Sequence, residues 1–214
     1  FAGEIARVGK DVTGFTVGDQ VFGTSGLRLG AYGEFMAAPA RGTIVEKPRN
    51  MSFADAAAAP MGGLNALHFM RLADTHPGDR VLILGAGGSI GAHAVQIAKS
   101  MGADVTAVDI STKAEFLRRL GADHVVDYAT EDALATAERY DVVFDMVPGS
   151  SLTAALRALR PGGRYLHGNP RLSILIRAPF VRRFTSKTAT CAFARETGDE
   201  LLTLKAMIEA GAAG

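Results

Sequence analysis

The hydrophobic pattern of the chain changes character near residue 79. An uninterrupted apolar run, Val81–Leu84, ends at Gly85, which is typical of a strand covered on both faces of a parallel sheet. Apolar residues then recur at helical spacing from Ile90 to Met101, and Gly102 is placed to end that helix. The pattern therefore predicts a strand followed directly by a helix.

This pairing of strand and helix is repeated along the rest of the chain. Further strands are predicted at residues 104–110, 125–128, 141–147 and 164–167. Further helices are predicted to begin at Thr112, Glu131, Leu152 and Thr197. The helices at Thr112 and Thr197 open with a capping-box pattern. The helix at Glu131 is expected to end at Arg139, and the run Pro161-Gly162-Gly163 is expected to stop the helix at Leu152. Successive units of this kind predict an α/β fold with a doubly wound parallel sheet.

Residues 1–50 follow a different pattern, in which short apolar stretches alternate with glycines. Such spacing is typical of short strands joined by tight turns, because glycine tolerates a positive φ. A short capped helix is predicted to begin near Ser52 and to end before Pro60, linking two domains. We expect an irregular all-β segment with its linker at residues 1–57 and the doubly wound domain at residues 58–214.

Residues 170–195 depart from the alternating pattern. Basic residues from Arg171 to Arg195 stand among apolar ones such as Leu172 and Phe184, which predicts an amphipathic insert. Two roles remain open for it. It is either a partly packed surface helix with solvated charges, or a lid or subunit contact over a cofactor cleft.

Composition and charge exclude several classes of function. The chain is 48% hydrophobic and 21% charged, as in a folded globular protein. Lys and Arg number 23 against 22 Asp and Glu, which is too balanced for a protein that neutralises nucleic-acid phosphates. The single cysteine, Cys191, allows neither an internal disulfide nor a thiolate metal cluster and is compatible with a cytoplasmic location. Because no apolar run reaches the roughly 18 residues of a membrane span, we expect no membrane partner.

The main candidate site is the segment Gly85–Gly91. A glycine-rich turn between a strand and a helix lets the backbone approach a pyrophosphate, whose charge the helix N-terminus favours. Gly91, one turn into the helix, allows helix and strand to pack closely. The spacing departs from GxGxxG, because Ala86 stands where the first glycine belongs. A purely structural turn is the alternative.

Asp109 ends the next predicted strand. A carboxylate at this point can accept hydrogen bonds from the adenosine ribose and would repel a 2′-phosphate, which favours NAD over NADP. Lys113 complicates the choice, because its ammonium can bind a phosphate or pair with a nearby carboxylate. An ordinary aspartate at a strand end is the alternative.

The ends of the fourth and fifth predicted strands supply further candidates, because ligands bind outside the carboxyl edge of a parallel sheet. Backbone groups of residues 147–149 and 167–169 can contact the nicotinamide and its ribose there, although such turns contain glycine regardless of ligands. Among the five histidines, His167 alone lies by the predicted crevice, and a general-acid role for it is weighed against a structural one. No histidines have the spacing of paired metal ligands.

Several motifs, in the same order, resemble the medium-chain dehydrogenases/reductases, in particular their zinc-independent, quinone oxidoreductase-like branch with the zeta-crystallin-like proteins. Residues 2–5, 17–23 and 30–35 are similar to the later half of that family's GroES-like catalytic domain. Residues 60–67 resemble its interdomain motif, with Asn65 where threonine is usual. Residues 85–91, 94–99, 120–123 and 126–128 resemble its nucleotide-binding domain.

The resemblance implies a Rossmann-type domain after a partial GroES-like segment, with NAD or NADP as cofactor and no zinc. The residues it implies for the pyrophosphate are Gly85, Ala86, Gly87, Gly88, Ser89 and Ile90. Asp109 and Lys113 would flank the adenosine ribose, and Tyr128 would lie on the adenine side. The residues expected near the nicotinamide are Asn65, Gly168 and Asn169, with Val147 added from its place at a strand end.

The family's chains extend beyond both ends of this sequence. The resemblance therefore implies an incomplete chain, whose last strand and much of whose substrate pocket lie elsewhere, and a full-length homodimer. The expected function is hydride transfer between nicotinamide and a small quinone, carbonyl or activated alkene. The alternative is a dinucleotide-binding or structural module without turnover.

Overall fold

The structure is a computed structural model that describes residues 1–26, 30–169 and 172–214. They form two compact units: unit 1 contains Phe1–Leu64 and Arg195–Gly214, and unit 2 contains Asn65–Ala194. Helix α1 (Phe53–Leu72) contributes residues to both units. The predicted division between residues 57 and 58 falls inside this helix, and residues 195–214 cluster with unit 1 rather than with the sheet of unit 2. As an assignment of functional domains, the division stays a prediction.

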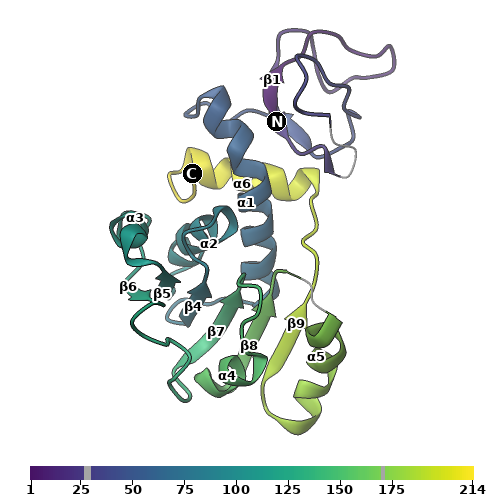
Figure 1. The fold of residues 1–214 in the computed structure, drawn as a ribbon. Coiled ribbons are helices and arrows are strands. Elements are labelled where there is room, and N and C mark those ends of the chain that lie inside the picture. The colour runs from purple at the N-terminus through teal and green to yellow at the C-terminus, as the bar shows by residue number, and fades with distance from the viewer. Residues whose placement is uncertain (27–29, 170–171) are drawn as a thin grey trace. The chain divides into compact units, whose positions relative to one another are not determined.

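Unit 2 is built on a parallel sheet, which confirms the predicted doubly wound fold (Figure 1). Its strands among the described residues are β4 (Arg80–Leu84), β5 (Asp104–Asp109), β6 (His124–Asp127), β7 (Tyr140–Asp145), β8 (Leu159–His167) and β9 (Thr188–Cys191). Their order in the sheet is β6-β5-β4-β7-β8-β9, and every neighbouring pair is parallel. The order reverses between β4 and β7, and doubly wound sheets bind their ligands beside such a point.

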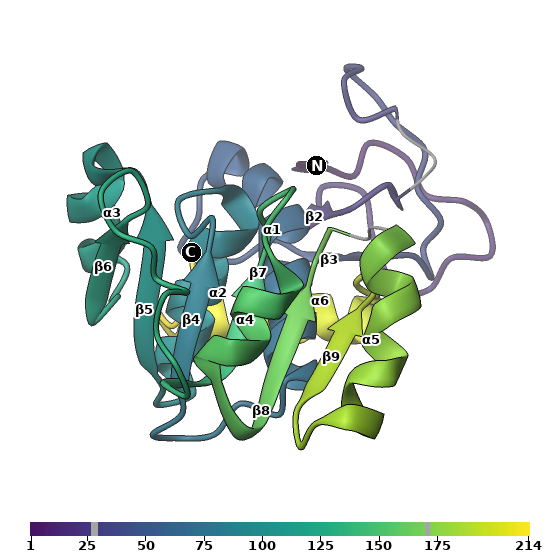
Figure 2. The same ribbon diagram turned by 60° about the horizontal axis from the view of Figure 1, so that its bottom comes forward.

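Helices cover both faces of this sheet, as Figure 2 shows for α2 and α4. The helices of unit 2 after α1 are α2 (Ser89–Ser100), α3 (Ala114–Arg119), α4 (Leu152–Ala158) and α5 (Leu172–Phe184). Leu82, Val143 and Tyr165 share one buried cluster with residues of α4 and α5. Because side chains alternate along a strand, Phe144 faces the other side, where its ring lies 5.1 Å from that of Phe69 in α1. Burial on both faces explains the continuous apolar runs of the central strands.

Two predicted local features are wrong. Residues 131–139 form turns instead of a helix, because the Asp132 carboxylate accepts the N–H of Leu134 (2.9 Å) and Glu138 adopts a φ of +47°. Bonds of this kind between side chain and backbone compete with helix formation. Thr112 does not open a capping box, since it lies in a 3₁₀ turn (Ser111–Lys113) and no side chain caps α3.

Strand β8 begins earlier than predicted. It starts at Leu159, so α4 ends at Ala158 and the Pro161-Gly162-Gly163 run lies inside the strand instead of stopping the helix. The pairing with β7 is irregular near this start, and Gly162 has a φ of +80° that favours glycine. The residues that the sequence pattern marks as a helix stop, 161–163, therefore lie in an irregular part of strand β8.

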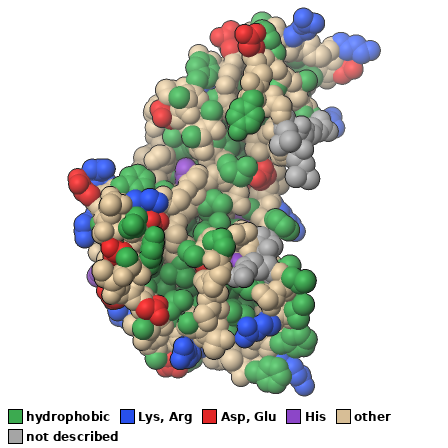
Figure 3. All heavy atoms as spheres, viewed as in Figure 1, with side chains coloured by type: hydrophobic (Ala, Val, Ile, Leu, Met, Phe, Trp, Pro, Cys, Tyr) green, Lys and Arg blue, Asp and Glu red, His purple; other side chains and the backbone are tan. Residues whose placement is uncertain are grey.

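The predicted amphipathic insert contains helix α5 and strand β9. Pro170 and Arg171, at its start, lie outside the described residues. Three residues of α5 are buried, namely Ile174, Ala178 and Val181, which agrees with a partly packed helix. Other hydrophobic side chains of α5 are exposed near basic ones (Figure 3). Strand β9 completes the sheet as a sixth strand, which the hydrophobic pattern did not predict.

Unit 1 contains a small antiparallel sheet, as expected for the all-β segment. Its strands are β1 (Ala2–Glu4), β2 (Gln20–Gly23) and β3 (Ile44–Glu46). Helix α1 continues through Pro60, so the predicted short helix ending before this residue is wrong. Residues after Pro60, such as Leu64 and Met70, are fully buried, and their burial outweighs the hydrogen bond that proline cannot donate. Helix α6 (Gly198–Glu209) begins at the predicted cap Thr197.

Candidate dinucleotide-binding site

The turn between β4 and α2 is shaped by close approach of the backbone. Gly85 has a φ of +77°, a conformation that favours glycine. Its N–H and that of Ala86 donate to the carbonyl of Val108 on β5 at 3.1 and 3.0 Å. A Cβ on Gly91 would lie 2.6 Å from Ala86 Cα and closer still to the Gly85 carbonyl oxygen. Glycine is therefore required at residue 91, where the first turn of α2 packs against the end of β4.

The N-terminus of α2 has no side-chain cap. Its N-cap residue, Gly88, has extended backbone with φ −86° and ψ 169°. The N–H groups of a first helical turn have no partner within the helix, and the helix dipole is positive at this end. These features fit a bound pyrophosphate. The residues predicted for that role, 85–90, surround this one helix end, and their role stays a prediction.

Asp109 connects the turn to the end of β5. Its Oδ2 accepts the N–H of Gly87 (2.7 Å), and its Oδ1 accepts the N–H of Ile110 (2.9 Å). The Nζ of Lys113 lies 3.1 Å from Asp109 Oδ1 and donates to the Gly87 carbonyl, also at 3.1 Å. Of the two roles open to Lys113, pairing with a carboxylate is the one present in the structure.

The protonation state of Asp109 follows from these contacts. Its burial acts to raise the pKa, but the donors of Ile110, Gly87 and Lys113 outweigh burial and hold the pKa below the ordinary value of 3.8. Asp109 is therefore ionised at neutral pH. The three contacts use three of about four acceptor positions of a carboxylate, which leaves capacity for a ligand hydroxyl.

The residues predicted for the nicotinamide side lie at the ends of β7 and β8. Val147 follows β7 closely, and a Cβ on Gly85 would lie 3.4 Å from its Cγ2. Gly168 follows β8, and a Cβ there would lie 3.2 Å from the Phe69 ring and would clash with Met146 Sδ. The structure thus places Val147 beside the glycine-rich turn, and a side chain at residue 168 would require Met146 and Phe69 to shift.

The remaining predicted residues border the same edge of the sheet. Asn65 lies one helical turn before Phe69 in α1, on the same side of the helix. Asn169 is exposed. Tyr128 follows β6, is 62% exposed and donates its N–H to the Asp109 carbonyl (3.4 Å). All the predicted cofactor-binding residues therefore belong to unit 2 and gather at the carboxyl edge of its sheet, while their contacts with a nucleotide stay a prediction.

Sequence reasoning missed a buried polar cluster under these strand ends. Asp145 pairs in register with His167, and both side chains are fully buried. Asp145 Oδ2 accepts the hydroxyl of Tyr165 (2.8 Å) and that of Ser150. The signal in the sequence was an acidic residue closing an apolar run. His167, the candidate general acid, is enclosed by protein in this structure, so its position favours the structural role.

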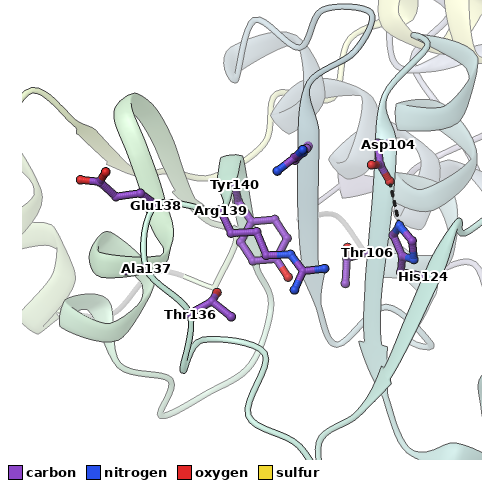
Figure 4. A pocket seen from close by; sticks show the side chains of 9 residues that line it. Asp104, Thr106, His124, Thr136, Ala137, Glu138, Arg139 and Tyr140 are labelled. Atoms are coloured by element: carbon purple, nitrogen blue, oxygen red, sulfur yellow. Dashed lines mark ion pairs between the residues drawn. The ribbon is translucent and has the colours of Figure 1, made fainter.

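A cavity of about 490 Å³ lies at the opposite edge of the sheet (Figure 4). Its lining includes Arg80, Asp104, His124 and Tyr140, which are the first residues of β4 to β7. Asp104 Oδ1 lies 3.5 Å from His124 Nε2. Doubly wound sheets bind ligands outside the carboxyl ends of their strands. The candidate site is therefore placed at the carboxyl edge and not in this cavity.

The part of the chain that the structure describes contains neither a metal-site grouping nor a membrane-spanning helix. Within residues 1–26, 30–169 and 172–214, no three His, Cys, Asp or Glu residues are grouped so that they could hold a metal ion. In the same part of the chain, no helix has the length and apolar character needed to cross a membrane. Zinc independence stays a prediction.

Known proteins similar to this chain support the family resemblance seen in the motifs. Residues 89–167 match the family model described as zinc-binding dehydrogenase. The quinone oxidoreductase from Coxiella burnetii has a similar structure, with a TM-score of 0.89 at 28% sequence identity, over 100% of this chain and 68% of that one. These matches support membership of the medium-chain dehydrogenase/reductase superfamily. The resemblance seen in the motifs is thereby confirmed.

Curated relatives are similar to this chain over most of its length. The 2-methylene-furan-3-one reductase of Solanum lycopersicum is 33% identical over 171 residues, which are 76% of this chain and 43% of the reductase. The mitochondrial NAD(P)H oxidoreductase RTN4IP1 of Mus musculus is 34% identical over 168 residues, 74% of this chain and 42% of that protein. The chain thus spans less than half the length of these two curated relatives.

Proposed function

We propose that this chain forms the dinucleotide-binding part of an NAD(P)-dependent oxidoreductase acting on a small quinone, carbonyl or activated alkene. The observation that carries the proposal is the turn at residues 85–91, where glycine is sterically required and an uncapped helix N-terminus lies at the carboxyl edge of the sheet. The similarity to an NAD(P)H oxidoreductase and to a quinone oxidoreductase supports the same cofactor and reaction class.

The chain's own residues would act mainly by orientation. Amides of the first turn of α2 would bind the pyrophosphate, and Asp109 would accept a hydrogen bond from the adenosine ribose. Asn65, Val147 and the 168–169 loop would border the nicotinamide. When bound, the nicotinamide supplies the hydride chemistry. A cytoplasmic homodimer is part of the same proposal.

We propose NAD as the preferred nucleotide. The ionised Asp109 would repel a 2′-phosphate. The Lys113 ammonium, which would attract one, is already paired with that carboxylate. The net charge beside the ribose is therefore close to zero, with an acceptor for ribose hydroxyls in place.

The substitution Gly88→Asp tests the pyrophosphate site. The backbone of Gly88 suits any residue, and an added Cβ would have its nearest neighbour, the Gly85 carbonyl oxygen, at 3.5 Å. Aspartate is a favoured N-cap residue, so the variant should be at least as stable as the wild type. The introduced carboxylate would accept hydrogen bonds from the N–H groups of the first turn of α2, and its charge would repel the phosphates of the dinucleotide. We expect the affinity for NADH and NADPH, measured by fluorescence titration, to fall about tenfold or more.

Thr197→Asp is the matched control for this variant. It introduces the same residue at the N-cap of α6 in unit 1, so it should leave the affinity for NADH and NADPH unchanged. Unaltered nucleotide binding by a folded Gly88→Asp variant would show that the pyrophosphate is not bound at this turn.

A binding module without turnover is the second candidate function, because His167, the candidate acid, is buried in the structure. Spectrophotometric oxidation of NADH and NADPH by the full-length protein, with panels of quinones, enones and aldehydes, separates the two. Tight binding without turnover of any acceptor would support the module.

A further inference from the structure

Asp145 forms hydrogen bonds to both loops of the predicted nicotinamide side. Its Oδ1 accepts the N–H of Val147 (2.9 Å), and its Oδ2 accepts the hydroxyl of Ser150. These two bonds hold the loop after β7. The backbone carbonyl of Asp145 accepts the N–H of Gly168 (3.1 Å), which begins the loop after β8. One residue therefore connects residues 147–150 with residues 168–169.

The hydroxyl of Tyr165 adds a fourth bond, from within β8. It donates to Asp145 Oδ2 at 2.8 Å, and it also lies 3.2 Å from Nδ1 of His167. We call Asp145, Ser150, Tyr165 and His167 the strand-end cluster. The rings of Tyr165 and His167 are stacked, with an interplanar angle of 12°, so the side chains of β8 in this cluster are held against each other.

The protons of the cluster can be assigned from these contacts. Burial acts to raise the pKa of Asp145, but the neighbouring His167 first, 3.6 Å away, and then the hydroxyls of Ser150 and Tyr165 outweigh it and lower the pKa. Burial and the nearby Asp145 charge raise the pKa of Tyr165, so its hydroxyl stays protonated. That single proton is donated to Asp145, which leaves the phenol oxygen as an acceptor for the N–H at Nδ1 of His167.

The Asp145 carboxylate accepts hydrogen bonds from loop residues, although its burial alone does not require donors from a loop. A buried charge needs donors, and core side chains can supply them. Here two of the donors, the N–H of Val147 and the hydroxyl of Ser150, belong to the loop. Gly149, between them, has a φ of +96° and open space around its Cβ position. The loop therefore has few packing contacts of its own at that point and is held through Asp145.

We propose that the strand-end cluster, with Asp145 at its centre, positions the 147–150 and 168–169 loops for binding the nicotinamide half of the dinucleotide. This inference rests on the proposed function. Asp145, Tyr165 and His167 are positioning residues in it, since they act through the backbone of the loops and not on the substrate.

The test compares two ligands that differ by the nicotinamide. Ser150→Ala removes one donor and leaves Val147 and Tyr165 on the carboxylate, so the chain should still fold. We expect its affinity for NADH to fall about fivefold or more, the scale of one lost hydrogen bond. Its affinity for ADP-ribose, which lacks nicotinamide, should change less than about twofold. NADPH and 2′-phospho-ADP-ribose form the corresponding pair of ligands.

Two further variants complete the experiment. Tyr165→Phe keeps the ring, removes the bond from β8 and should give the same selective loss of NADH affinity. Ser100→Ala is the matched control, because the Ser100 hydroxyl donates to the Ile97 carbonyl (2.7 Å) at the far end of α2. It should leave the affinities for both ligands unchanged.

The outcomes separate this inference from the proposed function. Equal weakening of NADH and ADP-ribose by Ser150→Ala, or no weakening of either, would overturn the positioning role. If Gly88→Asp abolishes binding of both ligands while Ser150→Ala leaves their ratio unchanged, the proposed function stands and this inference falls. If the wild-type chain binds neither NADH nor NADPH, both are overturned.

Discussion

At the scale of single residues, the choice of nucleotide depends on the charge around Asp109. The Asp109→Ser substitution removes the carboxylate that would repel a 2′-phosphate and releases the Lys113 ammonium that would attract one. We expect the preference for NADH over NADPH to narrow by about tenfold, as for the loss of one close charge contact. The ratio of the two dissociation constants is the measurement.

The opposite substitution supplies the control for this prediction. Lys113→Met keeps an unbranched, flexible side chain but leaves the Asp109 carboxylate without its ammonium partner, so the preference for NADH over NADPH should widen. If the ratio stays at the wild-type value in both variants, Asp109 has no part in the choice of nucleotide.

Residue-level features differ in how far the sequence predicts them. Asp109 and Gly91 were predicted because their roles depend on local order: a strand, a turn, a helix and the end of the next strand. The partnership of Asp145 with Tyr165 joins residues 20 positions apart. It depends on the register of β7 against β8, which the hydrophobic pattern does not specify. The sequence therefore marks Asp145 as an acidic residue at the end of an apolar run but does not identify its partners in the buried cluster.

At the scale of elements, the cap of α6 shows a case in which local sequence decides. The Oγ1 of Thr197 accepts the N–H of Glu200 at 3.2 Å. Thr197→Ala should lower the stability of this helix by about 1 kcal/mol, the usual cost of a lost N-cap. Amide hydrogen exchange in the first turn of α6 measures it. Thr197→Ser keeps a capping hydroxyl and should restore protection, and equally fast exchange in both variants would contradict the cap.

Other elements were predicted wrongly for identifiable reasons. The Asp132 carboxylate bonds the backbone of its own turn, so residues 131–139 do not form the helix that their composition allows. Helix α1 passes through Pro60 because its later residues are buried. Continuous apolar runs were better guides, since Val81–Leu84 is a central strand of the sheet. A strand that is buried on both faces can be recognised from its continuous apolar residues. The residue at which a helix or strand ends depends instead on competing local hydrogen bonds.

At the scale of the whole molecule, the division into two units depends on contacts between distant segments. The amide of Asn50 donates to the Ile208 carbonyl at 2.9 Å, and the hydroxyl of Thr24 donates to Glu196 at the same distance. Such bonds join residues 195–214 to unit 1. The sequence pattern, which places these residues after the last predicted strand, contains no signal for that pairing.

Unit 2 also concentrates the carboxylates whose protonation is linked to folding. In Asp109, Asp123 and Asp145, burial acts to raise the pKa and hydrogen bonds outweigh it, so each pKa lies below the ordinary 3.8. The unfolded chain therefore binds protons more readily than the folded one as the pH falls. The stabilisation by these groups is present well above pH 3.8 and is lost as the pH falls through 3.8 toward the folded pKa values. We expect the free energy of unfolding of unit 2 to decrease between about pH 6 and pH 3.

Asp123→Asn isolates one of these groups. The wild-type carboxylate accepts bonds from Lys99 Nζ (2.7 Å) and from the N–H of Val105 (2.8 Å), and the amide oxygen of asparagine can keep the second bond. The variant lacks the titrating group, so its deficit in free energy of unfolding should be largest near pH 6 and should shrink toward about pH 3. Urea unfolding followed by circular dichroism at stepped pH measures the deficit.

Lys99→Met removes the ammonium partner and should also flatten the wild-type pH dependence, because the folded pKa of Asp123 then moves toward the unfolded value. A deficit that is the same at every pH would mean that the ion pair contributes nothing to the acid sensitivity of unit 2.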